Sequence, residues 1–455
     1  MQKIIQAQKD FYKKGNTREV TFRIEKLKQL RKSIKAHQEG IIKALYKDFK
    51  KPRTETLSSE IGVAIDELNL HIKKLKKWNR PKWVFPHLSN FLSMDRIYRN
   101  PYGQVLIISP WNYPFNLAIV PLIGAISGGN TVVLKPSEYS PHTSAIIKKI
   151  LSEIFPEEYV AVIEGDARVS QELLKEKWDY IFFTGSPAVG KIVYQSAARH
   201  LTPVTLELGG KSPVVIDETA NLKIAARRIV WGKYFNAGQT CIAPDYVLLH
   251  ESLQEKFIAL LDQEITAMYG ENPQRSEDYA RIINKKNSLR LKRLLENVNI
   301  VIGGKTDIEK NYISPTVVLN PEHDSELMQY EIFGPILPVI TYSQPEEMEE
   351  VLQKHKNPLA FYIFSNNKKF RRYLIEKYAF GGGVINDVLV HFVNPRLPFG
   401  GVGESGIGKY HGKHSFLTFT RSKPVVYRSN FPDIPARYPP VTQWKEKLIK
   451  FIFRL

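Results

Sequence analysis

The single cysteine among the 455 residues is the side chain best suited to nucleophilic chemistry. Cys241 stands in the stretch 235–244 (FNAGQTCIAP), where Gly238 and Pro244 interrupt regular structure on either side. A free cysteine is most often a small, inert core residue. The polar neighbours and the two structure-breaking residues instead indicate a thiol on a turn, where it can meet a ligand.

A carboxylate that could serve as a base precedes the cysteine. Glu207 lies in the stretch 204–213 (VTLELGGKSP), between an apolar run and the pair Gly209 and Gly210. A single glutamate is more often a helix cap or an ion-pair partner. A half-buried carboxylate at the end of an apolar strand, however, has a raised pKa that suits general-base catalysis.

Four further short motifs accompany these two. They are 109–115 (SPWNYPF), 134–138 (LKPSE), 183–190 (FTGSPAVG) and 331–335 (EIFGP). In this order and over nearly the whole chain, the six motifs resemble those of the aldehyde dehydrogenase superfamily. The chain is most similar to the class 3 group of fatty and aromatic aldehyde dehydrogenases, because the amino-terminal extension of the tetrameric classes is missing and the stretch 386–391 (NDVLVH) is typical of that group.

The resemblance implies three catalytic roles. Cys241 would attack the aldehyde carbon, and Glu207 would deprotonate the water that hydrolyses the resulting thioester. The amide of Asn112 and the backbone N–H of Cys241 would stabilise the oxyanion.

The resemblance also implies a nicotinamide dinucleotide as cofactor. The residues expected to bind it are Trp111, Lys135, Glu138, Gly185, Ser186, Gly190, Glu331 and Phe333. A carboxylate at Glu138 accepts a hydrogen bond from a ribose 2′-hydroxyl and repels a 2′-phosphate, so NAD is favoured, whereas Lys135 leaves NADP possible. No metal is expected, because the 11 histidines are dispersed.

The elements that must position these residues follow from the hydrophobic pattern. Apolar strands alternate with helical runs such as 117–127, which predicts a doubly wound parallel sheet with ligands at the carboxyl ends of its strands. The expected strands are Val105–Ile108, Thr131–Leu134, Val160–Glu164 and Tyr180–Phe183. With the helical residues 1–51, in which Thr17 is a plausible cap, they indicate an NAD(P)-binding domain of residues 1–80 and 104–208.

A second α/β unit is expected over residues 209–400, as a catalytic domain. Its expected strands are Pro213–Ile216 and Tyr246–His250, its expected helices are Leu222–Trp231, Leu253–Gly270 and Ser288–Leu295, and the run Ile313–Leu319 leads toward Glu331. His391 is expected to be a buried, hydrogen-bonded imidazole. The fold class is therefore α/β, with two doubly wound parallel-sheet domains and a small β arm, as in the aldehyde dehydrogenase fold.

Residues 81–103 and 401–432 are expected to form that arm. The segments 81–86 and 96–102 read as extended, and the resemblance implies pairing with a carboxy-terminal strand over Ser415–Val426. Because such a hairpin is unstable alone, a homodimer partner is expected.

The composition is that of a globular protein, with 43% hydrophobic and 24% charged residues and a formal net charge of +19. The basic residues are scattered without a recognition motif, so nucleic acid is not an expected partner, and either a solvated basic surface or attraction to anionic lipid remains open. One cysteine allows no internal disulfide, and no signal peptide is evident, which places the protein in the cytoplasm. Residues 100–134 lack charge, but Pro110, Pro114 and Pro121 argue against a membrane span.

The tail, residues 433–455, carries a basic amphipathic pattern from Trp444 to Leu455. Twelve residues are too few to cross a bilayer. The helix could lie on the inner face of an anionic membrane, or dock on the protein itself or its dimer partner. Fatty aldehyde dehydrogenases carry a longer membrane-directed tail at this end.

The predicted function is NAD(P)-dependent oxidation of a medium- or long-chain aliphatic or aromatic aldehyde to its carboxylic acid. A CoA-acylating relative is the nearest enzymatic alternative, although such relatives generally lack the base that Glu207 supplies. A non-catalytic dinucleotide-binding scaffold at a membrane is the alternative of another class. Serine hydrolysis has no support, because no Gly-x-Ser-x-Gly motif is present.

Overall fold

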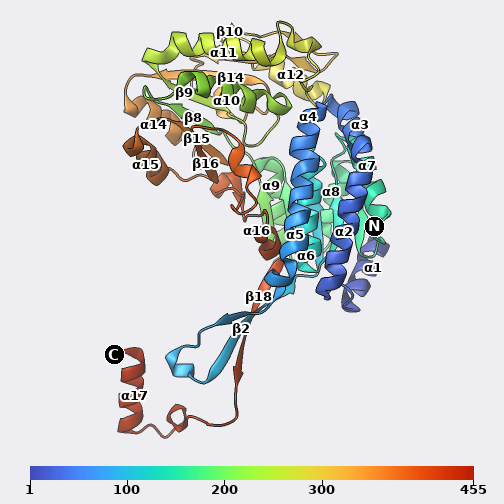
Figure 1. The fold of residues 1–455 in the computed structure, drawn as a ribbon, viewed down its shortest axis with the longest axis vertical. Coiled ribbons are helices and arrows are strands. Elements are labelled where there is room, and N and C mark those ends of the chain that lie inside the picture. The colour runs from blue at the N-terminus through green and yellow to red at the C-terminus, as the bar shows by residue number, and fades with distance from the viewer.

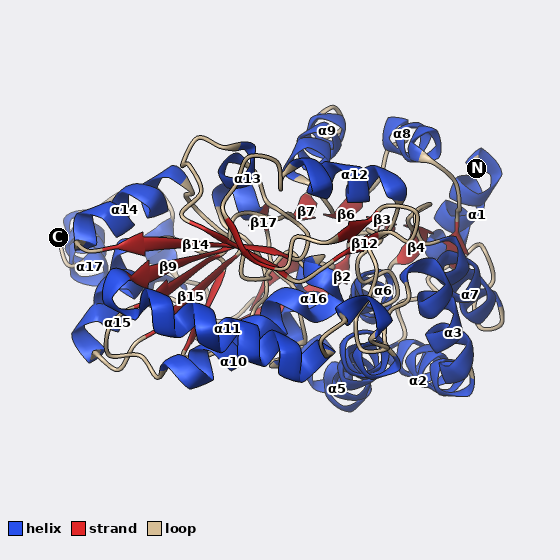
Figure 2. Cartoon of the chain, turned by 90° about the horizontal axis from the view of Figure 1, so that it is seen from above, coloured by secondary structure: helices blue, strands red, loops and turns tan.

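The computed structural model describes all 455 residues as two α/β bodies and a projecting arm (Figure 1). In each body a mainly parallel sheet lies between layers of helices (Figure 2). This arrangement confirms the fold class that the alternation of strands and helices predicts.

Three helices open the chain: α1 (Gln2–Lys13), α2 (Val20–Ala36) and α3 (Gln38–Phe49). On α2 the apolar residues Leu27, Leu30 and Ile34 are completely buried, as their helical spacing requires. The expectation that Thr17 caps a helix is wrong. The N-cap of α2 is Glu19, and the Thr17 hydroxyl lies in the core without a hydrogen-bond partner, because the helix begins three residues further on.

The first sheet has six strands in the order β17-β7-β6-β3-β4-β5. Their bounds are Gly406–Ile407 (β17), Val204–Glu207 (β7), Tyr180–Thr184 (β6), Gln104–Ile108 (β3), Thr131–Lys135 (β4) and Val160–Val162 (β5). The four strands predicted in this region are confirmed, although β5 ends at Val162 rather than Glu164. All neighbours are parallel except β17, which pairs antiparallel with β7.

Helices pack around this sheet on both faces. Besides α1 to α3 they are α4 (Arg53–Thr56), α5 (Val63–Asn79), α6 (Asn116–Gly128), α7 (Pro141–Ser152), α8 (Ala167–Lys175), α9 (Pro187–Ala198) and α16 (Lys413–Thr418). Every residue of α6 is buried, which explains the uncharged stretch as a core helix. No helix has both the length and the apolar character needed to cross a bilayer.

The second sheet has seven strands in the order β10-β13-β14-β9-β8-β15-β16. Their bounds are Ile300–Ile302 (β10), Thr316–Leu319 (β13), Ile336–Tyr342 (β14), Tyr246–His250 (β9), Pro213–Ile216 (β8), Ala360–Phe364 (β15) and Gly382–Ile385 (β16). Only β10 is antiparallel to its neighbour. A separate pair joins β11 (Thr306–Asp307) to β12 (Tyr312–Ile313).

Six helices accompany the second sheet. They are α10 (Leu222–Tyr234), α11 (Gln254–Tyr269), α12 (Lys285–Arg293), α13 (Glu326–Gln329), α14 (Pro345–Lys354) and α15 (Lys368–Lys377). The predicted helices over 222–231, 253–270 and 288–295 are thereby confirmed, with shifted ends.

The arm is a three-stranded sheet of β1 (Lys82–Val84), β2 (Ser93–Pro101) and β18 (Thr420–Arg428). The pairing of β2 with β18 confirms the expected arm. The expected start of the last strand at Ser415 is wrong, because Lys413–Thr418 is helical. Ser415 and Phe416 are buried there, and the Ser415 hydroxyl donates to Oε1 of Glu67 at 3.0 Å.

The tail forms a helix, α17 (Gln443–Phe453), at the far end of the arm and away from both bodies (Figure 1). Its apolar residues Trp444, Phe451 and Phe453 are exposed. Its contact with the arm includes the ring of Phe453, which stacks on His87 with centroids 5.9 Å apart. The tail helix is therefore confirmed, and it does not dock on the body of its own chain.

Candidate active site

The cysteine loop follows α10 and reverses the chain through left-handed backbone. Asn236, Ala237 and Gly238 have φ angles of 55°, 52° and 73°. A Cβ on Gly238 would lie 2.3 Å from the carbonyl oxygen of Gly334, so only glycine fits there. Asn236 and Ala237 adopt a left-handed conformation that is unfavourable for residues other than glycine. Contacts with other segments of the chain must therefore stabilise it.

Those contacts come from hydrogen bonds to distant segments. The backbone N–H of Asn236 donates to Oε2 of Glu55 at 3.0 Å, and its side-chain amide donates to the carbonyl of Asn112 at 2.9 Å. The Gln239 amide donates to the carbonyl of Arg281 at 3.0 Å and accepts from the N–H of Ile283 at 2.9 Å. The loop that carries the thiol is thus held on several sides.

Glu207 ends β7 and stands beside Thr184, the last residue of β6, in the register of the parallel sheet. The Glu207 side chain is fully buried rather than half-buried, with 2% exposure, which corrects the sequence interpretation. Neither carboxylate oxygen has a hydrogen-bond partner, and the Thr184 hydroxyl has none either. Burial raises the pKa of Glu207 well above its ordinary value, as a general base at neutral pH needs.

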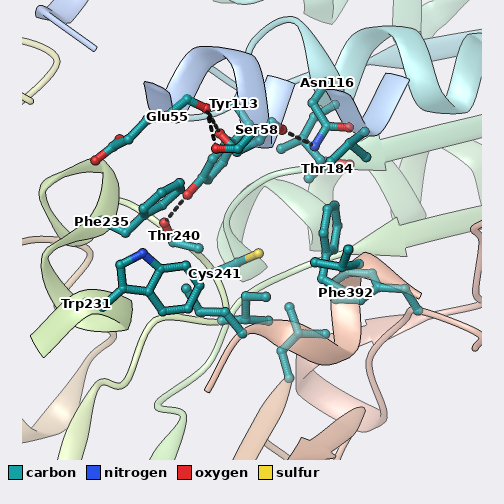
Figure 3. A pocket seen from close by; sticks show the side chains of 18 of the residues that line it. Glu55, Ser58, Tyr113, Asn116, Thr184, Trp231, Phe235, Thr240, Cys241 and Phe392 are labelled. Carbon is teal, nitrogen blue, oxygen red and sulfur yellow. Dashed lines mark hydrogen bonds between the residues drawn. The ribbon is translucent and has the colours of Figure 1, made fainter. Parts of the chain in front are cut away.

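Cys241 and Glu207 open into one cavity of about 560 Å³. Its remaining lining is mostly apolar and aromatic. It includes Tyr113, Leu117, Trp231, Phe235, Ile242, Met268, Tyr269, Leu359, Leu389, Phe392, Val393, Phe399 and Tyr410. Figure 3 shows the sulfur of Cys241 directed into this space. A thiol and a carboxyl group therefore share an apolar pocket.

Burial raises the pKa of the Cys241 thiol, and the nearby carboxylates of Glu331 and Glu207 raise it further. At neutral pH the thiol of the unliganded protein is therefore protonated. Because the thiolate is the nucleophile, attack on a carbonyl carbon requires a group that takes up the proton.

Asn112 lies in the turn after β3 and is buried against the cysteine loop. Its Nδ2 donates to the carbonyl of Gln239 at 3.0 Å. The next residue, Tyr113, shares a hydrogen bond of 2.7 Å with the hydroxyl of Thr240 (Figure 3). The structure thus brings Asn112 next to the loop of Cys241, as the sequence motifs predict, and one amide hydrogen remains for another acceptor.

Residues expected to hold a dinucleotide follow the carboxyl ends of β4 and β6. Lys135 and Glu138 form an ion pair of 2.9 Å. Ser186 is the N-cap of α9, where free N–H groups face outward. A Cβ on Gly185 would lie 2.5 Å from the Phe183 ring, so this turn needs glycine. At Gly190 a Cβ would lie 2.6 Å from a side-chain atom of Leu208, which keeps α9 close to the strand end.

The third group lies around Glu331. The rings of Trp111 and Phe333 meet edge to face with centroids 5.3 Å apart. Oε1 of Glu331 is buried without a partner, and burial, reinforced by Asp245, raises the pKa of this carboxyl to about 8. A Cβ on Gly209 would lie 2.1 Å from Glu331 Oε2. An unsatisfied acceptor, a glycine turn at a helix N-terminus and two rings suit a dinucleotide, so the residues present fit this cofactor.

His391 departs from expectation. Both of its ring nitrogens are buried without a hydrogen bond, and burial lowers the pKa of the imidazole to about 4. The prediction of a hydrogen-bonded imidazole is therefore wrong. The ring stacks against Phe399 with centroids 6.0 Å apart, because residues 390–393 form a tight turn beside that aromatic side chain.

Sequence reasoning missed the acidic and basic residues behind the cysteine loop. Glu55, Glu60 and Lys51 are buried, and Glu55 lines the cavity. In a helical segment rich in charged residues, the sequence pattern does not distinguish a buried charged residue from one on the solvent-exposed face. No group of three or more His, Cys, Asp or Glu residues is arranged to hold a metal ion.

Comparison with known proteins gives consistent matches. A model of the aldehyde dehydrogenase family matches residues 1–425. The 4,4′-diaponeurosporen-aldehyde dehydrogenase of Staphylococcus aureus is 46% identical over 448 residues, which are 98% of this chain and 97% of that protein. Aldehyde dehydrogenase family 3 member A2 of Macaca fascicularis is 42% identical over 99% of this chain and 93% of its own length.

Two further matches agree with these. The mouse protein described as aldehyde dehydrogenase, dimeric NADP-preferring, is 42% identical over 96% of this chain and 97% of its own length. The solved structure of the substrate-bound state of Staphylococcus aureus AldH superposes with a TM-score of 0.97, at 46% identity and 99% coverage of both chains.

Proposed function

The chain belongs to the aldehyde dehydrogenase family and is an aldehyde dehydrogenase. We propose that it oxidises medium- or long-chain aliphatic and aromatic aldehydes to carboxylic acids. The observation that carries this proposal is the apolar cavity of about 560 Å³ that holds both Cys241 and Glu207. Apolar walls favour a hydrocarbon chain or an aromatic ring over a sugar or a phosphate.

Cys241 forms the first bond. Its sulfur adds to the aldehyde carbon, and the carbonyl electrons move to oxygen. Since burial raises the pKa of the thiol, its proton must leave as the carbon–sulfur bond forms, and we propose that it passes to water in the cavity, which leaves Glu207 unprotonated for the later hydrolysis. The free amide hydrogen of Asn112 and the backbone N–H of Cys241 stabilise the oxyanion, at about 3–4 kcal/mol for one such donor.

A nicotinamide dinucleotide bound to this chain supplies the acceptor for the hydride that the former aldehyde carbon loses. Glu331 would accept a hydrogen bond from the nicotinamide ribose, with Trp111 and Phe333 in the same region. The turn from Gly185 to Gly190, with Ser186, would hold the pyrophosphate.

Lys135 and Glu138 would hold the adenosine ribose. We propose NAD as the preferred cofactor, because a carboxylate at Glu138 accepts from a 2′-hydroxyl and repels a 2′-phosphate. The buried ammonium of Lys135 leaves NADP as the alternative, and one relative is described as NADP-preferring.

Glu207 completes the cycle. It takes a proton from water, whose oxygen adds to the thioester carbon, and the carbon–sulfur bond breaks to release the carboxylic acid. This role sets the chain apart from CoA-acylating relatives, in which a thiol replaces the water. An acid as product, without CoA dependence, is the expected result.

We propose further that residues 1–80 and 104–208 bind the cofactor and that residues 209–400 carry the catalytic thiol. The arm formed by β1, β2 and β18 joins two copies into a homodimer, since one relative is described as dimeric and the arm projects away from both α/β bodies. A cytoplasmic enzyme with reversible membrane contact through α17 fits the exposed apolar and basic residues of that helix.

The test is a screen of purified protein with hexanal, decanal and benzaldehyde against NAD and NADP, following reduced cofactor and acid product. We expect oxidation of all three, higher kcat/KM with NAD and no requirement for CoA. A Cys241→Ser variant should be inactive, because a serine hydroxyl is a far poorer nucleophile at neutral pH. Formation of acyl-CoA in place of free acid, or activity that survives in Cys241→Ser, would overturn the assignment.

A further inference from the structure

The cavity around Cys241 carries acidic groups and no basic ones. Glu55, Glu207 and Asp278 line it, whereas no lysine, arginine or histidine does. The protein as a whole has a formal net charge of +19, so this distribution opposes that of the rest of the chain. An anion that enters this cavity from the basic surface of the protein therefore finds acidic side chains and no positively charged one.

Glu55 is the buried acidic group away from the catalytic pair. It lies on α4, is 6% exposed, and its Oε2 accepts from the N–H of Asn236 at 3.0 Å. No protein group donates to its other oxygen. In Figure 3 Glu55 lies on the far side of Tyr113 and Thr240 from Cys241.

Lys51, the cation that lowers the pKa of Glu55, is already paired with another carboxylate. Nζ of Lys51 lies 2.8 Å from Oε1 of Glu60. The groups that face the Glu55 carboxyl are Lys51 and Glu60 from the adjoining segment, Asp278 from the loop between α11 and α12, and the phenols of Tyr113 and Tyr269. Burial raises the pKa of Glu55 to about 8, and Asp278 and Glu60 raise it while Lys51 lowers it.

We propose that Glu55, together with Asp278, is a charge filter of the substrate pocket. An aldehyde that bears a carboxylate on a chain short enough to stay inside the cavity is rejected, and an uncharged aldehyde of the same size is admitted. The physical reason is that a second anion in a poorly solvated pocket is repelled by the first and finds no cation to pair with. The filter rests on the proposed aldehyde oxidation and specifies its substrate class.

Glu55 also stabilises the cysteine loop by accepting a hydrogen bond from Asn236, and a suitable variant separates this structural role from the charge of the side chain. Glu55→Gln keeps an oxygen that can accept from Asn236 and removes the ionisable group. Asp278→Asn neutralises the exposed member of the pair. Glu271→Gln removes the same charge at an exposed position outside the cavity and serves as the matched control.

The experiment compares 4-carboxybenzaldehyde with 4-methylbenzaldehyde, at pH 7 and at pH 9, as the ratio of their kcat/KM values. Electronic differences between the two aldehydes are the same for every variant and cancel when variants are compared. The contributions of Cys241 and Glu207 to the pH dependence are likewise present in all variants. The ratio therefore reports the charge of the pocket wall.

We expect the wild-type preference for 4-methylbenzaldehyde to increase from pH 7 to pH 9, as Glu55 loses its proton. In Glu55→Gln this increase disappears, and at pH 9 the ratio moves toward 4-carboxybenzaldehyde by about tenfold, the size of one unfavourable charge interaction at intermediate distance. Asp278→Asn moves the ratio in the same direction at both pH values. Glu271→Gln behaves as the wild type.

Other outcomes contradict the filter. If 4-methylbenzaldehyde is oxidised and both pocket variants keep the wild-type ratio, the filter is overturned while the aldehyde activity stands. If Glu55→Gln lowers kcat/KM for both aldehydes by the same factor, Glu55 only supports the cysteine loop and the filter is overturned. If Glu55→Gln does not fold, an unchanged ratio in the exposed Asp278→Asn overturns it. If neither aldehyde is oxidised, the proposed function fails and the filter with it.

Discussion

Nζ of Lys51 lies 2.8 Å from Oε1 of Glu60, and neither side chain is exposed to solvent. The other oxygen of Glu60 accepts from the N–H of Asn116 at 2.8 Å, and the Lys51 ammonium lies 3.8 Å from the centre of the Tyr113 ring. Tyr113 in turn bonds Thr240, the residue before Cys241. One buried ion pair therefore supports both the turn of Asn112 and the loop of Cys241.

Lys51→Met should destabilise the protein strongly, because it leaves the Glu60 carboxyl buried without its cation. Breaking a buried pair in this way costs about 3–5 kcal/mol of unfolding free energy. Burial raises the pKa of Glu60, so the folded state holds that proton more tightly than the unfolded state does. The loss in the variant should therefore be smallest at acid pH and grow as the pH rises. Urea unfolding measures it.

The control for this experiment is Lys148→Met, whose pair with Glu164 is exposed at 2.9 Å. A surface pair contributes about 0–1 kcal/mol, so this variant should unfold close to the wild type. Equal losses in the two variants would show that the burial of Lys51 has no special importance.

Alkylation of Cys241 should be slow at neutral pH and accelerate as the pH rises beyond the ordinary range of a thiol. Burial and the nearby Glu331 and Glu207 raise its pKa, so the thiolate forms only at higher pH. Iodoacetamide and intact-mass measurement report this directly, because the chain has one cysteine. In Glu207→Gln one neighbouring negative charge is gone, and the profile should shift to lower pH. A wild-type thiol that reacts fully at pH 7 would contradict the geometry.

Glu207→Gln should separate the two halves of the reaction. We expect it to release one equivalent of reduced cofactor and then stall as the thioester at Cys241, with steady turnover lowered by roughly 10²–10⁴, the usual contribution of a general base. Rapid-mixing absorbance and intact mass detect the burst and the acyl group. Absence of the burst would place the main action of Glu207 before hydride loss.

Gly209→Ala should weaken cofactor binding. A Cβ at this position would lie 2.1 Å from Oε2 of Glu331, so the carboxylate must move from its place. Calorimetric titration with NAD at pH 9, where a Glu331 carboxyl with a pKa of about 8 is ionised, should show a dissociation constant raised by about tenfold or more, since displacement of one charged hydrogen-bond acceptor costs about 1.5–3 kcal/mol. Gly40→Ala, in helix α3 with 3.4 Å to the nearest side-chain atom, is the control and should bind NAD normally. Unchanged affinity in Gly209→Ala would remove Glu331 from the cofactor site.

Deletion of residues 441–455 tests the tail. The intact protein should co-sediment with anionic vesicles at low salt and be released at high salt, because salt screens the attraction between the lysines of α17 and the anionic headgroups. The truncated protein should stay in solution, with unchanged activity on short aldehydes. Equal sedimentation of both forms would exclude the membrane contact, and a change of oligomeric state on deletion would indicate that α17 docks on the dimer partner instead.

The sequence by itself predicted the strands β3 to β6, β8 and β9 and several helices, and it indicated Cys241 and Glu207 as the expected nucleophile and base. Strands such as β3 and β4 are short apolar runs between breakers, and the motifs around Cys241 and Glu207 are contiguous, so both signals are local and readable without coordinates. The predictions of secondary structure were wrong where tertiary packing overrides the local sequence pattern. The pattern predicts a strand from Ser415, but Lys413–Thr418 is helical, and this helix buries Phe416 in the core.

Only the tertiary structure decided which charges enter the site. Glu55 accepts a hydrogen bond from Asn236 across 181 positions of the chain, and Asp278 reaches the region of Glu55, Lys51 and Glu60 from the distant loop between α11 and α12. It also showed that Glu207 has no partner and that the nitrogens of His391 have none. Burial and pairing depend on contacts between residues far apart in the chain, and these set the pKa values and the charge of the pocket, so no local pattern could reveal them.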